Sequence, residues 1–177
     1  VVSGMAMGID AAAHQGALQA DRGEHCPTLA VVGTGLDQVY PHQHHGLAQD
    51  IAECGWVLSD QPIGTKPLPH HFPLRNRLID GLSQGVLVVE AAMQSGSLIT
   101  AQLALDQGKE VFAIPGSIHS ALSRGCHALL RQGAKLVENI QDIREELPAL
   151  DSHCANSLRP AMPPILQDES AQAVWQA

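Results

Sequence analysis

Aromatic side chains are scarce in this chain, since Phe, Trp and Tyr together make up 3% of its 177 residues. Long hydrophobic runs are missing as well, and no apolar stretch approaches the ~20 residues that a membrane-spanning helix needs. The overall hydrophobic fraction is nevertheless 45%, an ordinary value for a globular protein with a buried core. The sequence therefore predicts a globular protein with no membrane partner.

Cysteine pairs at metal-binding spacing are also absent. The four cysteines are scattered, at positions Cys26, Cys54, Cys126 and Cys154. Without a C-x-x-C pair they form no zinc-site pattern, and reduced thiols are typical of cytosolic proteins. Five histidines at 42–45 and 70–71 have no carboxylate or cysteine at ligand spacing beside them. We expect a cytoplasmic protein with no metal and no cofactor.

Basic residues are few in this sequence. The chain has 10 Lys and Arg against 18 Asp and Glu, a net charge of −8, which argues against a protein that coats nucleic acid indiscriminately. The imbalance is uneven, because residues 1–137 carry 8 basic against 11 acidic residues and residues 138–177 carry 2 against 7. A local basic crevice in the first part of the chain remains compatible with this composition.

Strand and helix patterns alternate along most of the chain. Runs of Val, Ile, Leu and Ala predict buried strands at 28–33, 85–90 and 109–114, and the intervening and preceding segments predict helices at 10–20, 42–54 and 97–107. This alternation is typical of an α/β fold, a mostly parallel sheet with helices on both faces. We expect one core domain over residues 1–147, truncated at its N-terminus because the chain starts in mid-strand, and a linker or tail over 148–177.

The most informative stretch is residues 72–100. It begins with Phe72-Pro73-Leu74-Arg75-Asn76-Arg77, continues with a buried strand, and ends in a turn of Ser and Gly that feeds a helix start near Ser97. Free backbone N–H groups at such a helix start bind anions, most often phosphate. Similar small-residue turns follow residues 2, 32 and 114. In a parallel sheet these turns lie at one edge, where ligands bind.

Two interpretations stay open for the key side chains. Phe72, together with the Pro- and Gly-rich loop before it, suits the stacking of an unpaired base, or else anchors the following helix as a hydrophobic staple. Arg75 and Arg77 either donate to phosphate oxygens, or one of them pairs with Glu90 or Asp80 to brace the site.

Several short motifs, taken in order, closely resemble the DNA-processing protein A family (DprA, also called Smf). They are Ser3-Gly4-x-Ala6-x-Gly8-Ile9-Asp10, Gly33-Thr34-Gly35-Leu36-Asp37-x-x-Tyr40-Pro41, Phe72-Pro73-x-Arg75-Asn76-Arg77-x-Ile79, Glu90-Ala91-x-x-x-Ser95-Gly96-Ser97-Leu98-Ile99-Thr100-Ala101 and Pro115-Gly116. The resemblance implies an extended Rossmann-like domain that binds single-stranded DNA. It also implies protection of incoming DNA, loading of the RecA recombinase during natural transformation, no catalytic turnover, and a homodimer.

Carried over by position, the resemblance implies a DNA-binding set from the first four motifs and the loop before the third. The set is Ser3, Gly4, Gly33, Thr34, Lys66, Phe72, Arg75, Asn76, Arg77, Ser95, Gly96, Ser97 and Thr100. Many relatives carry Arg where this chain has Met7, so one phosphate contact is expected to be missing. A C-terminal winged-helix domain of many relatives would follow the linker.

The rival interpretation is an enzyme. A related group of Rossmann-like proteins cleaves nucleoside monophosphates at the glycosidic bond, and Arg75, Arg77 and Glu90 could take its catalytic roles. The Pro-Gly-Gly turn of that group is missing, and Ser95-Gly96-Ser97 stands in its place. Fold analogy alone does not establish function, and we favour the binding protein.

Overall fold

A computed structural model describes residues 1–20 and 26–147 of the chain. The described residues form two compact units, residues 1–75 and residues 76–147. The predicted linker or tail over 148–177 lies outside the described residues. Within the described ranges no helix is both long enough and apolar enough to cross a bilayer.

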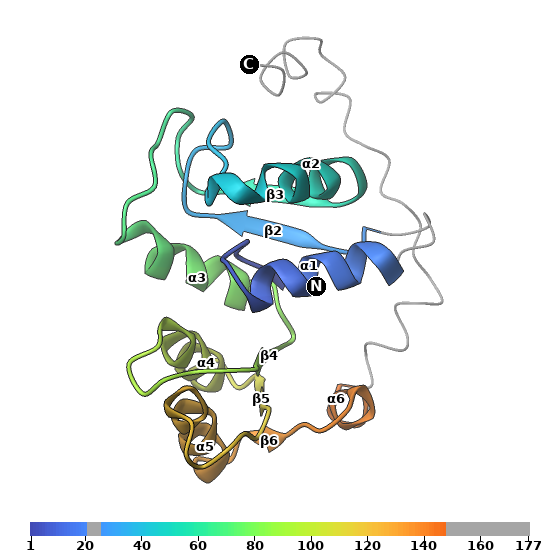
Figure 1. The fold of residues 1–177 in the computed structure, drawn as a ribbon, viewed down its shortest axis with the longest axis vertical. Helices are drawn as coiled ribbons and strands as arrows, with labels where there is room; N and C mark the ends of the chain where they lie inside the picture. Colours follow the sequence, from blue (N-terminus) through green and yellow to red (C-terminus); the bar gives the residue numbers. More distant parts are fainter. Residues whose placement is uncertain (21–25, 148–177) are drawn as a thin grey trace. The chain divides into compact units, whose positions relative to one another are not determined.

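The first unit is built on a three-stranded parallel sheet in the order β1-β2-β3 (Figure 1). Its strands are β1 (Val2–Ser3), β2 (Leu29–Val32) and β3 (Trp56–Ser59). Helices α1 (Ile9–Ala20) and α2 (His45–Cys54), the latter preceded by the 3₁₀ turn η1 (His42–His44), supply apolar residues to the core. Ala30 and Val32 point into this core from one face of β2, because side chains alternate along a strand.

The second unit repeats the arrangement with a parallel sheet in the order β4-β5-β6. Its strands are β4 (Gly85–Val88), β5 (Glu110–Ala113) and β6 (Lys135–Leu136). Figure 1 shows α4 (Gly96–Asp106) and α5 (Arg124–Arg131) on one side of this sheet and α6 (Ile140–Glu146) on the other. The 3₁₀ turn η2 (Ala121–Ser123) leads into α5. On α4, small residues such as Ala101 and Ala104 let the helix pack closely on the strands.

Helix α3 (His71–Gly81) is the helix expected after Phe72, and it already begins at His71. Proline is tolerated in the first turn of a helix because the N–H groups there have no partner within the helix. Pro73 therefore lies inside α3 without breaking it. The other expected helices and strands appear within a few residues of their predicted bounds, and the predicted fold class, α/β with parallel strands flanked by helices, is confirmed.

A buried histidine joins α1 to the residue that precedes β2 in the first unit. The His14 side chain is fully buried, its Nδ1 lies 2.7 Å from the Thr28 hydroxyl, and its Nε2 has no hydrogen-bond partner among the described residues. Burial disfavours the charged imidazolium and lowers the pKa of His14 from 6.5 to about 4. The neutral ring is therefore the form that the fold accommodates.

Acid should consequently weaken the fold through His14. The unfolded chain binds a proton at His14 more readily than the folded chain does. His14 therefore leaves the free energy of unfolding unaffected above pH 6.5 and lowers it progressively as the pH falls toward about 4. We expect this residue to account for about 2 kcal/mol of the free energy of unfolding, after allowance for solvent screening. Urea unfolding over a pH series measures the effect.

The control for this prediction is a second histidine. His14→Gln should flatten the pH dependence between these limits, whereas the same change at the exposed His119 should leave it as in the wild type. An unaltered pH dependence in His14→Gln would assign the titration to other groups.

Candidate nucleic-acid interface

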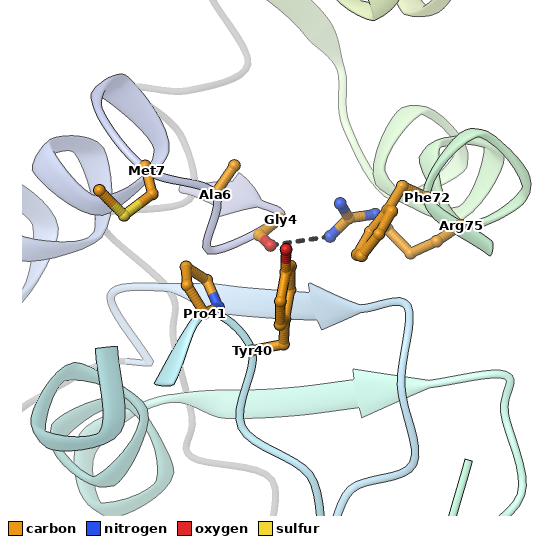
Figure 2. Close-up of a pocket in the computed structure, with 7 residues that line it drawn as sticks. All are labelled: Gly4, Ala6, Met7, Tyr40, Pro41, Phe72 and Arg75. Atoms are coloured by element: carbon orange, nitrogen blue, oxygen red, sulfur yellow. Dashed lines mark hydrogen bonds between the residues drawn. The ribbon is translucent and has the colours of Figure 1, made fainter. Parts of the chain in front are cut away.

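A pocket of about 310 Å³ opens in the first unit, beside the carboxyl ends of β1 and β2 (Figure 2). The residues that line it come from the turn after β1, the segment before η1, and the first two turns of α3: Gly4, Ala6, Met7, Tyr40, Pro41, Phe72 and Arg75. The carboxyl edge of a parallel sheet is the usual place for a ligand in an α/β protein. This pocket is therefore the candidate site.

Arg75 is the charged residue that lines the pocket. Its side chain is buried, with 5% of the residue exposed, and its Nη1 donates to the carbonyl oxygens of Gly4, at 2.9 Å, and of Val31. Burial lowers the pKa of Arg75 below its usual range, while the negative charge of Asp10 opposes this shift. The guanidinium thus holds together the ends of β1 and β2, and Figure 2 shows its bond to Gly4.

The glycine at position 4 is required by this packing. A Cβ built on Gly4 would lie 2.3 Å from Arg75 Nη1, closer than any side chain tolerates. Glycine therefore lets the backbone approach the guanidinium closely enough for a hydrogen bond. The sequence motif suggested that Gly4 faces the DNA. The structure shows in addition that Gly4 makes room for the Arg75 guanidinium.

Phe72 and Tyr40 form the aromatic side of the pocket. Their ring centroids are 5.6 Å apart with the planes inclined at 31°, and the Arg75 guanidinium carbon lies 6.0 Å from the centroid of the Phe72 ring. Phe72 also packs on Gly33, where an added Cβ would lie 3.1 Å from the ring. The neighbouring His71 bonds through Nδ1 to the Gly33 carbonyl oxygen at 3.2 Å, which ties the start of α3 to the end of β2.

The turn between β1 and α1 has its backbone amides engaged within the protein. The N–H groups of Gly4 and Ala6 donate to Asp10 Oδ2, at 3.0 and 3.2 Å. Met5 adopts a positive φ of 58°, and its carbonyl oxygen lies 2.8 Å from Nδ1 of His44. Two amides of a turn that was expected to offer free N–H groups are thus bonded to a carboxylate. Ser3, at the end of β1, is half-buried beside this turn.

The turn after β2 is also fixed internally. Thr34 is buried, its hydroxyl donates to the Gln38 carbonyl oxygen at 2.7 Å, and its own carbonyl oxygen accepts from the Ser59 hydroxyl at 2.6 Å. Asp37 accepts from the Gly64 N–H at 2.7 Å, and this bond lowers the pKa of the Asp37 carboxyl. Lys66 is exposed two residues beyond Gly64.

The remaining predicted residues belong to α3 and to the second unit. Asn76 is half-buried and Arg77 is exposed on α3. Ser95 caps α4, since its Oγ accepts from the Ser97 N–H at 3.2 Å and lies 3.2 Å from the Ser97 hydroxyl. Gly96 and Ser97 are exposed in the first turn of α4, and Thr100 is half-buried one turn later. The helix start predicted near Ser97 is present, with its first residue at Gly96.

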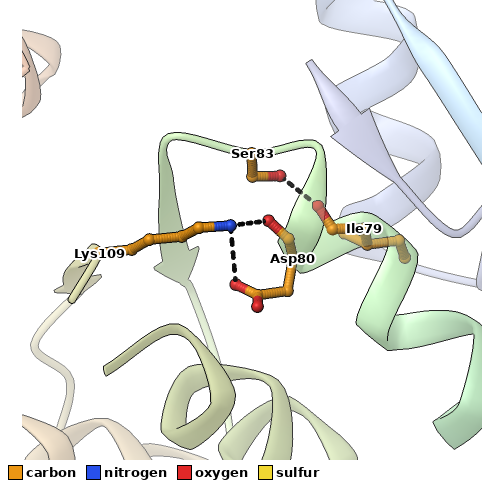
Figure 3. A network of polar contacts seen from close by, with 4 residues as sticks. All are labelled: Ile79, Asp80, Ser83 and Lys109. Carbon is orange, nitrogen blue, oxygen red and sulfur yellow. Dashed lines mark hydrogen bonds and ion pairs between the residues drawn. The ribbon is translucent and has the colours of Figure 1, made fainter. Parts of the chain in front are cut away.

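The sequence suggested that Arg75 or Arg77 pairs with Asp80. In the structure a lysine lies beside the Asp80 carboxylate. Within the second unit, Lys109 Nζ lies 3.7 Å from Asp80 Oδ1 and also donates to the Asp80 carbonyl oxygen (Figure 3). Asp80 is fully buried, and neither carboxylate oxygen has a hydrogen-bond partner among the described residues. Lys109 thus supplies the positive charge beside Asp80, while the Nη1 of Arg75 bonds to backbone carbonyls in the first unit.

Sequence reasoning missed several residues of the pocket region. Tyr40 and Met7 line the pocket, and Asp10 and His44 hold the turn that forms its rim. Tyr40 and Asp10 stand inside the motifs quoted above, so their place in those motifs was a usable signal, whereas His44 has no local signal. Among the described residues no group of three or more His, Cys, Asp or Glu side chains is placed to hold a metal ion.

The two parallel sheets flanked by helices, with a pocket at a carboxyl edge, define a Rossmann-like α/β protein. The family model for DNA recombination-mediator protein A matches residues 1–148 of the chain. The chain belongs to this family.

Individual relatives agree with this assignment. The chain is 53% identical to the DNA processing protein DprA of Streptococcus pneumoniae, and the match covers 82% of this chain and 50% of the relative. It is 49% identical to protein Smf of Escherichia coli, and that match covers 83% of this chain and 38% of the relative. The chain thus spans about half or less of the length of these proteins.

Two solved structures with the same fold also carry the name of this family. The crystal structure of DNA processing protein A from Streptococcus pneumoniae superimposes with a TM-score of 0.74 at 51% identity, covering 82% of this chain and 50% of that one. The protein of the same name from Helicobacter pylori, described as having a unique single-stranded DNA binding mode, also gives 0.74, at 34% identity over 84% of this chain and 65% of that one.

Proposed function

We propose that this chain binds single-stranded DNA and serves as part of a DNA-processing protein of natural transformation and recombination. The observation that carries this proposal is the pocket at the carboxyl edge of β1 and β2, with an aromatic side formed by Phe72 and Tyr40. Stacking on aromatic rings is how proteins bind unpaired bases without reading sequence. The Helicobacter pylori relative with the same fold is described as binding single-stranded DNA, which supports the assignment.

The roles of the residues divide by burial. Phe72 offers a ring for stacking, and the buried Arg75 positions the walls of the pocket around it. Exposed Arg77 and Lys66 supply charge for phosphates, and the N-terminus of α4 at Gly96 offers a further anion-binding turn. Ser3, Gly4, Gly33, Thr34, Asn76, Ser95, Ser97 and Thr100 complete the proposed set. Because few cations take part, binding should weaken only gradually as salt is raised.

Further roles follow from membership of the family rather than from a particular contact. We propose that the whole protein acts in the cytoplasm as a homodimer, protects incoming DNA and helps to load RecA. We also propose that it acts by binding and catalyses no reaction of its own. The enzymatic alternative requires nucleobase release from AMP or CMP that is abolished in Glu90→Gln.

Fluorescence anisotropy with labelled oligo(dT) and with a duplex of the same length tests the central proposal. We expect oligo(dT) to bind more tightly than the duplex, because a paired base has no free face for Phe72. Phe72→Leu should weaken oligo(dT) binding by about 10-fold, in keeping with ~1–3 kcal/mol for one stacked base.

The matched control is Trp56→Leu. Trp56 is also an aromatic residue with an exposed ring, but it lies on β3 and does not line the pocket. Its replacement should leave oligo(dT) affinity unchanged. A wild-type protein that binds no oligonucleotide even at low salt would refute the proposed function.

A further inference from the structure

The turn between β1 and α1 contains a strained residue. Met5 has a positive φ of 58°, and it is the one non-glycine residue with a positive φ among those that the structure describes. This left-handed backbone is unfavourable for a residue with a Cβ. Glycine would relieve the strain, but the Met5 side chain is 1% exposed and packs in the core with Ala11 and Ile51. Other contacts must therefore hold the backbone of Met5 in this conformation.

Two side chains supply these contacts. Asp10, from α1, accepts from the N–H groups of Gly4 and Ala6, at 3.0 and 3.2 Å. These are the residues on either side of Met5. His44, from η1, bonds through Nδ1 to the Met5 carbonyl oxygen at 2.8 Å, and because a carbonyl oxygen can only accept, Nδ1 carries the proton. Asp10 lies close to the turn along the chain, whereas the His44 bond joins the turn to a segment 39 residues away.

The backbone of His44 is fixed to another part of the pocket lining. Its N–H donates to the Pro41 carbonyl oxygen at 2.9 Å, which closes the 3₁₀ turn η1 directly after Tyr40 and Pro41. Tyr40 and Pro41 line the pocket together with Ala6 and Met7 of the β1–α1 turn (Figure 2). One histidine is thus bonded both to the strained turn and to the segment that carries the Tyr40 ring.

We infer that His44 is a positioning residue of the candidate site: its imidazole fixes the β1–α1 turn against the segment that carries Tyr40. The inference rests on the proposed function, because it concerns the shape of the site that binds DNA. His44 itself does not line the pocket, so it acts on DNA only through the residues that it holds. Without this donor the Met5 carbonyl oxygen loses a bond, and the strained turn is no longer held in place.

Fluorescence anisotropy with labelled oligo(dT) tests the inference, in conditions where circular dichroism shows every variant to be folded. His44→Leu should weaken binding by about 5-fold, the loss that one internal hydrogen bond implies. His44→Asn should bind within about 2-fold of the wild type, because its amide can place an N–H donor near the position of Nδ1. The control is His45→Leu, which removes the neighbouring exposed histidine and should leave the affinity unchanged.

A second background separates positioning from a general loss of stability. In Tyr40→Ala, adding His44→Leu should change the affinity by less than about 2-fold, because the ring that His44 positions is already gone. The same addition should lower the free energy of unfolding as much as it does in the wild type, since that loss does not pass through Tyr40.

Three results would overturn the positioning role. They are wild-type affinity in His44→Leu, a His44→Asn variant that binds as weakly as His44→Leu, and an undiminished loss of affinity from His44→Leu in the Tyr40→Ala background. In each case the wild type would still bind oligo(dT), and the proposed function would stand. A wild type that fails to bind oligo(dT) would instead refute the proposed function and this inference with it.

Discussion

Replacing Arg75 by Ala is expected to lower the free energy of unfolding by about 2–4 kcal/mol, because two strand-end carbonyls lose their donor. The carbonyl oxygens of Gly4 and Val31 both accept from Arg75 Nη1, and the guanidinium is almost fully buried. Urea unfolding followed by tryptophan fluorescence measures the loss. In a Trp175→Phe background Trp56 is the only tryptophan, and it reports on the first unit.

The matched control lies two residues further along the same helix. Arg77 is exposed, and Arg77→Ala should lower the free energy of unfolding by less than Arg75→Ala does, because no buried carbonyl loses its donor. The same variant should reduce oligo(dT) affinity and its salt dependence, because a phosphate contact is lost. Wild-type stability in Arg75→Ala would contradict the structural role assigned to that guanidinium.

Replacing Lys109 by Met is expected to cost about 3–5 kcal/mol, because it leaves the buried carboxylate of Asp80 without a compensating charge. Lys109 Nζ lies 3.7 Å from Asp80 Oδ1, and Asp80 is fully buried with no hydrogen bond to either carboxylate oxygen among the described residues. Met keeps most of the length of the Lys side chain, so the loss reports the charge rather than a cavity. Urea unfolding followed by circular dichroism measures it.

A double-mutant cycle separates the charge from the packing. In Asp80→Asn with Lys109→Met, most of the lost stability should return, because no unpaired charge remains buried. Lys135→Met is the control, since Lys135 forms an exposed ion pair with Glu146 at 3.1 Å and its loss should cost far less stability than Lys109→Met. Additive losses in the double variant would show that Asp80 and Lys109 do not depend on one another.

Arg75 and Arg77 on α3 differ in their proposed roles. Arg75 acts on the protein itself by bonding to carbonyl oxygens of Gly4 and Val31, whereas Arg77 is exposed to solvent. A double replacement would therefore mix a loss of stability with a loss of charge. The single variants, compared at equal fraction folded, separate the contribution of each to DNA binding.

The sequence by itself determined the order and approximate bounds of the elements. Buried strands such as β2 and β5 are short runs of apolar residues, and Ser95 signals the start of α4 through a cap that lies within its own turn. These signals are local, so they can be read without knowing the rest of the fold. The ordered motifs likewise identified the family, because each is a continuous stretch of chain.

Tertiary structure alone decided which polar groups face inward. Arg75 and Arg77 are the same residue type two positions apart, yet one is buried and the other exposed, because a helix turns successive side chains to different sides. Asp80 and Lys109 are separated by 29 residues, and Arg75 and Gly4 by 71. Contacts between such distant positions depend on how the strands and helices pack, and local sequence carries no trace of them.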